Sequence, residues 1–100
     1  MREQCWIIHG LPVEPPPADV DLDFARKRHH EYIEQLDTDG LLVSHGATRD
    51  ERGQRYGTGL IVIRAATRPE AAAIAQREPY IEMGIRRLKL VPWQMQRGRT

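Results

Sequence analysis

Two short apolar runs constrain the fold of this chain more than any other feature. Residues 4–9 (Q-C-W-I-I-H) and 59–65 (G-L-I-V-I-R-A) are rich in β-branched and aromatic side chains, which is typical of strands. A strand with one solvated face alternates apolar and polar residues, whereas both runs are apolar at successive positions. We therefore expect them to form the two central strands of one sheet.

The first helix is predicted between a proline-rich loop and a glycine. Residues 11–20 contain four prolines, which exclude a helix there and favour an extended loop. Asp19 or Asp21 then caps a helix that runs to about Thr38. The Asp-Gly pair ending at Gly40 is a common signal for the end of a helix.

A capping box predicts where the second helix begins. Thr67 and Glu70 have the spacing of such a box, and Pro69 occupies the first turn. The alanine-rich helix is expected to end before Pro79, because the residue preceding a proline disfavours the helical conformation. Residues 79–84 are then expected to form a turn.

Two further runs alternate in polarity and are predicted to be edge strands. Residues 41–48 have too many polar positions for a central strand, and the charged segment 49–56 is typical of a hairpin loop. Residues 85–93 alternate basic and apolar side chains. Proline cannot donate a backbone hydrogen bond, so we expect Pro92 to end this second edge strand.

The order strand, helix, strand, strand, helix, strand predicts an α+β fold. Two right-handed crossovers joined by a hairpin give a ferredoxin-like βαββαβ arrangement, with a four-stranded antiparallel sheet and both helices on one face. The opposite face would leave apolar side chains of the central strands uncovered. A second copy of the chain is the simplest cover, so we expect a homodimer joined through the open sheet face.

Composition indicates one soluble domain spanning residues 1–100, with an ordered core over about 4–94. Hydrophobic residues make up 40% and charged residues 29% of the chain, which excludes a disordered protein. A net charge of +1 predicts no general affinity for nucleic acid, and no apolar run is long enough to predict a membrane span. The single Cys5 permits no internal disulfide, so we expect a cytoplasmic protein with a buried, inert thiol.

Basic residues are concentrated toward the C-terminus. We interpret them as part of a solvated edge strand and tail rather than as a phosphate-binding patch. They are Arg86, Arg87, Lys89, Arg97 and Arg99.

His29 is the strongest candidate for a functional residue. The inward positions of the first helix, at steps of three or four residues, are Leu22, Ala25, His29, Ile33 and Leu36. An imidazole among apolar side chains needs a hydrogen-bond partner, and its ordinary pKa of about 6.5 suits proton transfer near neutral pH. One interpretation is a pocket that uses His29 as an acid and base, and the other is a core histidine bonded to a backbone carbonyl.

Three further residues complete this candidate site. Arg26 and Tyr32 stand three positions before and after His29, so we expect both on its side of the helix, in contact with a substrate. Arg26 could hold an anionic group through a two-pronged contact. Asp50 follows the second strand, and its carboxylate could fix the tautomer of the His29 ring, although the spacing alone does not show that it reaches it.

The chain resembles the YCII-related proteins over roughly residues 6–93, through four motifs in order. These are Arg26-x-x-His29 followed by Tyr32-Ile33, Gly46 four residues before Asp50, Glu78-Pro79-Tyr80 with Gly84, and Pro92-Trp93. The resemblance implies a ferredoxin-like dimeric α/β barrel with a small-molecule pocket between the sheet and the first helix. It also implies a His29–Asp50 acid/base pair, with Arg26 as a pocket cation and Tyr80 near the substrate.

Activities known in this family and its superfamily suggest reaction types. They include a dehydrochlorinase that acts on chlorinated hydroquinones, lactone isomerases and monooxygenases. Three departures from the family pattern are evident here. Ala47 replaces a proline after Gly46, Glu78 replaces an aspartate, and the first strand ends in His9 where many relatives carry an acid.

Two function classes follow. The first is a small enzyme, of the isomerase, lyase or dehydrochlorinase type, in which His29 and Asp50 move a proton on a cyclic or phenolic metabolite. The second is a non-catalytic ligand-binding or accessory module. We expect no metal and no other cofactor, because His29 and His30 point about 100° apart on a helix and no cysteine or carboxylate spacing matches a zinc site.

Overall fold

A computed structural model describes residues 2–98 of the chain, and its secondary structure has the predicted order with one short helix added. The strands are β1 (Arg2–Pro12), β2 (Leu42–Arg49), β3 (Arg55–Arg64) and β4 (Arg86–Gln96). The helices are α1 (Leu22–Thr38), α2 (Arg68–Gln76) and α3 (Pro79–Glu82). Within the described residues, no helix is long and apolar enough to cross a membrane.

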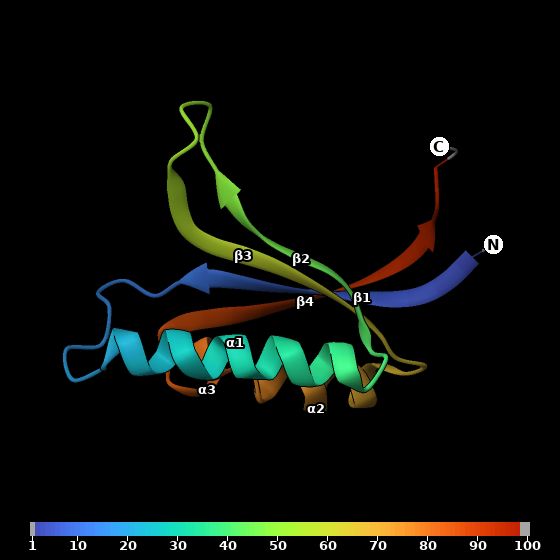
Figure 1. Cartoon of the computed structure of the whole chain (residues 1–100), viewed down its shortest axis with the longest axis horizontal. Coiled ribbons are helices and arrows are strands. Elements are labelled where there is room, and N and C mark those ends of the chain that lie inside the picture. The colour runs from blue at the N-terminus through green and yellow to red at the C-terminus, as the bar shows by residue number, and fades with distance from the viewer. Residues whose placement is uncertain (1, 99–100) are drawn as a thin grey trace.

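The four strands form one antiparallel sheet in the order β2-β3-β1-β4. The two strands predicted to be central are therefore central, and the two predicted edge strands lie at the edges. Figure 1 shows all three helices on one side of the strongly twisted sheet, while its other side is open. The predicted ferredoxin-like α+β architecture is confirmed.

The structure differs from the sequence prediction at two prolines, Pro79 and Pro92. Residues 79–84 were expected to be a turn, but Pro79 begins α3, which Glu78 caps through a bond from the Ile81 amide. β4 was expected to end at Pro92, yet it continues to Gln96, with Pro92 paired to Trp6. An edge strand tolerates proline because its missing donor falls on the unpaired side of the ladder.

The main core lies between the helices and the sheet. The inward side chains of α1 are Ala25, Ile33 and Leu36, all buried as predicted, and those of α2 are Ala71, Ile74 and Ala75. They pack on apolar side chains of the central strands, namely Trp6, Ile8, Ile61 and Ile63.

Leu22, which was also predicted to face inward, is 59% exposed, so that prediction is wrong. A helical side chain leans toward the N-terminus, and Leu22 is the first residue of α1. Its side chain therefore extends past the end of the packed layer.

The open face of the sheet carries a second, smaller apolar cluster. Cys5, Val62 and Met95 are buried there, with Ile7 packed against them. Burial raises the pKa of the Cys5 thiol, which keeps it in the unreactive protonated form expected from the sequence. Trp93 pairs with Cys5 across the strands and remains 40% exposed, so this face keeps a large uncovered aromatic surface.

Candidate functional site

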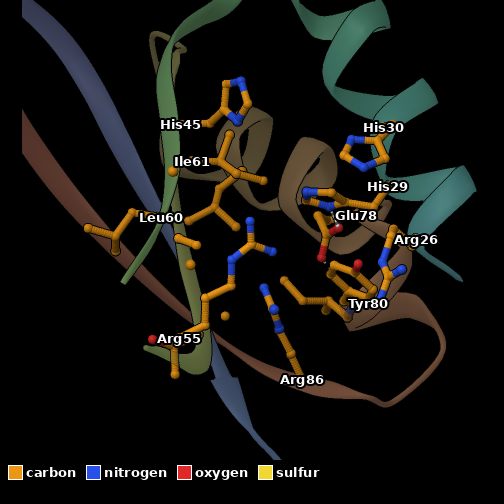
Figure 2. A pocket seen from close by; sticks show the side chains of 17 residues that line it. Arg26, His29, His30, His45, Arg55, Leu60, Ile61, Glu78, Tyr80 and Arg86 are labelled. Carbon is orange, nitrogen blue, oxygen red and sulfur yellow. Dashed lines mark hydrogen bonds and ion pairs between the residues drawn. The ribbon is translucent and has the colours of Figure 1, made fainter. Parts of the chain in front are cut away.

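A cavity of about 290 Å³ lies between α1 and the sheet. This volume is near the lower end of the range for small-molecule sites, about 300–1,000 Å³, and suits a ligand with one ring. Figure 2 shows side chains that reach the cavity from α1, from the connection between α2 and β4, and from the sheet. Its ionisable lining residues are Arg26, His29, His30, His45, Arg55, Glu78, Tyr80 and Arg86.

His29 and Glu78 form the closest polar contact of the cavity. Nδ1 of His29 lies 2.6 Å from Oε1 of Glu78, and the two side chains are 17% and 3% exposed. A buried carboxylate needs a hydrogen-bond donor, and the imidazole N–H is that donor. His29 thus faces inward from α1, and its partner is the Glu78 carboxylate rather than Asp50 or a backbone carbonyl.

The local sequence explains why Glu78 reaches His29. Glu78 precedes Pro79 and has an extended backbone, as expected before proline. Its Oε2 accepts a hydrogen bond from the Ile81 amide at 3.3 Å, which fixes the carboxylate at the start of α3. Its Oε1 is left to accept from His29 across the interface between α1 and α3.

The second ring nitrogen of His29 is the one available to a ligand. When Nδ1 donates to Glu78, the neutral ring has its lone pair on Nε2. Among the described residues, no group forms a hydrogen bond with Nε2 of His29. In the same part of the chain, every fully buried side-chain nitrogen or oxygen has a hydrogen-bond partner, so Nε2 is not fully buried. Nε2 therefore has access to the cavity or to solvent, where it can accept a proton.

This geometry predicts a single tautomer for His29. When the His29 ring is neutral, we expect its proton on Nδ1. NMR detects this tautomer through the ¹⁵N shifts of the two ring nitrogens. Glu78→Leu removes the acceptor and is expected to shift the ring toward the tautomer mixture of a free imidazole. An unchanged tautomer in that variant would show that Glu78 does not orient the ring.

Tyr80 covers the His29 ring. The two ring centres are 4.6 Å apart with an angle of 23° between planes, a stacked arrangement that restricts the imidazole. The guanidinium of Arg86 lies 4.4 Å from the centre of the same Tyr80 ring. Tyr80 thus lines the cavity, as the resemblance implied for it.

Arg26 and Tyr32 were predicted to share the side of α1 that carries His29, and only Arg26 does. Each step of three residues falls about 60° short of a full helical turn, so Arg26 and Tyr32 lie about 120° apart. Arg26 lines the cavity with a side chain that is 64% exposed, 4.0 Å from Asp23.

Tyr32 instead packs between α1 and α2. Its hydroxyl donates to the Ile74 carbonyl at 2.6 Å, and it lines a separate, smaller hollow. Burial raises the pKa of Tyr32 well above its usual range, and the negative charge of Glu78 raises it further. The hydroxyl therefore stays protonated as a structural donor, and its predicted contact with a substrate in the His29 cavity is not formed.

Asp50 does not pair with His29 within the chain. Its Oδ1 accepts hydrogen bonds from the backbone amides of Arg52 and Gln54, both at 2.9 Å, and it does not line the cavity. An aspartate at the start of a tight turn commonly binds the amides that follow it, and that local contact holds Asp50 in the β2–β3 hairpin. The carboxylate beside His29 is Glu78.

Sequence reasoning missed several residues of the cavity. Glu78 carried a signal, since an acid before a proline is a helix-capping pattern and the family motif places an acid there. Arg86 was assigned to a solvated strand, but its even-numbered position places it on the helix side of β4 with Leu88. His45 and Arg55 carried no local signal. Among the described residues, no group of three or more potential ligands is placed to hold a metal ion.

Comparisons with known proteins agree with this architecture. A solved structure with a similar fold is the 5-chloro-2-hydroxyhydroquinone dehydrochlorinase of Burkholderia phenoliruptrix AC1100, in complex with 2,5-dihydroxybenzoquinone. The TM-score is 0.59 at 11% identity, over 94% of this chain and 95% of that chain, which shows a shared fold.

A search of curated proteins found no match. The model of the YCII-related domain matches residues 15–94, which include α1, the hairpin, Glu78 and most of β4. Since this match spans most of the 100 residues, the chain belongs to the YCII-related domain family.

Proposed function

We propose that this protein is a small enzyme in which His29 transfers a proton on a cyclic or phenolic small molecule. The observation that carries the proposal is the 2.6 Å contact between Nδ1 of His29 and Oε1 of Glu78, at the wall of a cavity of about 290 Å³. A carboxylate on one nitrogen fixes the tautomer and the orientation of the ring, and leaves the other nitrogen to face a ligand. An oriented imidazole with one free nitrogen at a cavity wall is suited to general acid–base catalysis.

The chemical steps follow from the two ring nitrogens. Nε2 takes a proton from an acidic C–H or O–H of the substrate, and the electron pair stays on the substrate as an enolate or phenolate. The imidazolium that forms is stabilised by Glu78. The same nitrogen then returns the proton to another carbon, which gives isomerisation. In elimination the electron pair instead expels an anionic leaving group from the neighbouring carbon, and Nε2 releases its proton to water, so that the proton and the leaving group together account for the acid lost by the substrate.

The dehydrochlorinase with the same fold supports the elimination route and a phenolic substrate. Arg26 at the cavity rim and Tyr80 on the His29 ring are the proposed substrate contacts. Asp50 stays outside this proposal, because its carboxylate is engaged by the hairpin amides.

The proposal is tested by proton exchange. Hydroquinones, dihydroxybenzoquinones and lactones are incubated with the protein in D₂O, and deuterium incorporation or release of a leaving group is followed by mass spectrometry. An enzyme of this type exchanges a ring or α-carbon proton faster than buffer alone. Exchange at the buffer rate for every compound would contradict it.

The same panel separates the enzyme from a non-catalytic ligand-binding module. A ligand at 100 times its dissociation constant stabilises a protein by about 2.7 kcal/mol, which a thermal melt detects. A compound that raises the Tm without any exchange or turnover would favour the binding module.

We also propose that the chain forms a homodimer through the open face of the sheet, in a cytoplasmic protein. Trp93, which is 40% exposed beside the apolar cluster of this face, supports the interface, since a monomer leaves its side chain next to water. We expect sedimentation velocity at micromolar concentration to show a dimer.

Charge placed on that face should weaken the dimer. Trp93→Glu is expected to shift the protein toward the monomer, because a carboxylate would be buried without a partner. Phe24→Glu is the matched control, since Phe24 is 52% exposed on α1, outside the sheet face. A wild-type monomer, or a Trp93→Glu variant as dimeric as the control, would refute this interface.

A further inference from the structure

We infer that Arg86 is the anion-binding residue of the cavity and that its ligand is a small planar organic anion, either a carboxylate or an acidic phenolate. This inference deepens the proposed function by naming the substrate class of the same cavity. It rests on the position of the Arg86 side chain, on the charge of the cavity wall and on the aromatic ring beside the guanidinium.

Two glycines make room for the Arg86 side chain. A Cβ at Gly10 of β1 would lie 2.9 Å from Cδ of Arg86, and a Cβ at Gly59 of β3 would lie 3.2 Å from its Nη1. Gly10 and Gly59 are direct partners across β1 and β3. The arginine side chain therefore runs from β4 over β1 to β3, along the floor of the cavity. In the view of Figure 2 its end lies between Arg55 and Tyr80.

The guanidinium is held at its end by Tyr80, whose ring centre is 4.4 Å away. This contact with an aromatic face orients a guanidinium without using its fork of N–H donors in the plane. Among the side chains that the structure describes, no carboxylate forms an ion pair or hydrogen bond with Arg86. Its donors are thus available to a ligand.

The cavity wall has an excess of positive charge. Arg26, Arg55 and Arg86 line it, against Glu78 as the carboxylate among the described lining residues, and that carboxylate already accepts from His29. Opposite charge in a partly enclosed cleft raises the local concentration of anions. These arginines therefore favour an anionic ligand over a neutral one of the same shape.

The flat groups around the Arg86 guanidinium favour a planar ligand. Arg86 and His29 both contact Tyr80, one through its guanidinium and the other by ring stacking at 4.6 Å. An anionic group bound in the Arg86 fork places the attached ring beside these flat groups and next to His29. Arg86 thus determines which atom of the substrate faces Nε2.

The test is the affinity for benzoate, measured by isothermal titration calorimetry or NMR titration, with benzamide as the neutral probe of the same shape. The wild type should bind benzoate more tightly than benzamide. Arg86→Gln should weaken benzoate binding about 10- to 100-fold, the range expected for a charge-assisted, two-pronged contact, and should leave benzamide unaffected. Arg86→Lys should fall between, since it keeps the charge but loses the fork.

A glycine variant tests the position of the arginine apart from its charge. Gly10→Ala inserts a methyl group against Cδ of Arg86 and should weaken benzoate binding several-fold, with every charge retained. In the Arg86→Gln background the same substitution should have no further effect, because the two changes act through one side chain. Arg87→Gln is the matched control on the neighbouring, exposed position of β4 and should bind benzoate as the wild type does.

Several outcomes would overturn the inference. The first is a wild type that binds benzoate no more tightly than benzamide. The second is an Arg86→Gln variant that still prefers benzoate, and the third is an Arg87→Gln variant that loses as much benzoate affinity as Arg86→Gln. Folding of each variant is checked by its Tm. Benzoate binding through Arg86 without any proton exchange would leave the inference intact and refute the proposed function. Proton exchange on substrates whose KM is unchanged by Arg86→Gln would support the proposed function and refute the inference about Arg86.

Discussion

His29→Gln is expected to lower kcat by about 10²- to 10⁴-fold on any compound that the wild type turns over, the usual contribution of a general acid or base. The glutamine amide can still donate a hydrogen bond to Glu78, so the wall of the cavity should keep its shape. It has no nitrogen that gains and loses a proton near neutral pH. The measurement is kcat at saturating substrate, alongside the Tm of the variant.

Two companion variants make that result specific. His30→Gln changes a second histidine of the same cavity, whose ring centre is 5.7 Å from that of His29, and should have a much smaller effect. Glu78→Gln keeps an acceptor for Nδ1 but removes the charge that stabilises the imidazolium, so its kcat should lie between the other two. Full activity in His29→Gln, or equal losses in the two histidine variants, would contradict the role of His29.

The strand order was predictable because burial differs between central and edge strands. The two runs with successive apolar residues became β1 and β3, each with one face on the helices and the other on the second cluster. Strand lengths were less predictable. β3 begins at Arg55, four residues earlier than expected, since cross-strand hydrogen bonds continue through the hairpin regardless of side-chain polarity.

One member of the His29–Glu78 pair was predictable for a similar reason. An imidazole at an inward helical position needs a partner, and His29 has one. The identity of that partner depends on how α3 docks against α1, a tertiary contact between residues 49 positions apart. Asp50 was the wrong partner because a turn aspartate is satisfied locally, by the amides of Arg52 and Gln54.

Arg86 shows a different limit of sequence reasoning. Arg87 and Lys89 follow it in sequence, and this basic run favoured a solvated position for Arg86 as well. Its role depends on Gly10 and Gly59, which lie on two other strands and leave a channel for its side chain. Glycines within strands are the signal that was available, because they often mark a close approach of another group.

Trp6→Ala is expected to lower the free energy of unfolding by about 3–5 kcal/mol, as for other buried tryptophans. Trp6 is 6% exposed in the helix-side core, and its Nε1 donates to the Ala65 carbonyl at 3.0 Å. Arg68 places its guanidinium 5.1 Å from the ring centre, so one side chain ties β1 to the start of α2. Small domains have about 5–15 kcal/mol of stability in total, so the loss should be evident in urea or thermal unfolding.

Trp6→Phe separates the hydrogen bond from the packing. It retains an aromatic ring but leaves the Ala65 carbonyl without its donor, which should cost about 1–3 kcal/mol, plus a smaller amount for lost volume. Phe24→Ala is the control, because Phe24 is 52% exposed and its truncation should change the stability by no more than about 0.5 kcal/mol. All variants are compared at one protein concentration, since the proposed dimer would make the apparent stability concentration-dependent. If Trp6→Ala lowered the free energy of unfolding no more than Phe24→Ala, Trp6 would not hold the helix layer on the sheet. The core between α2 and β1 would then not be what supports the cavity wall formed by Glu78 and Tyr80.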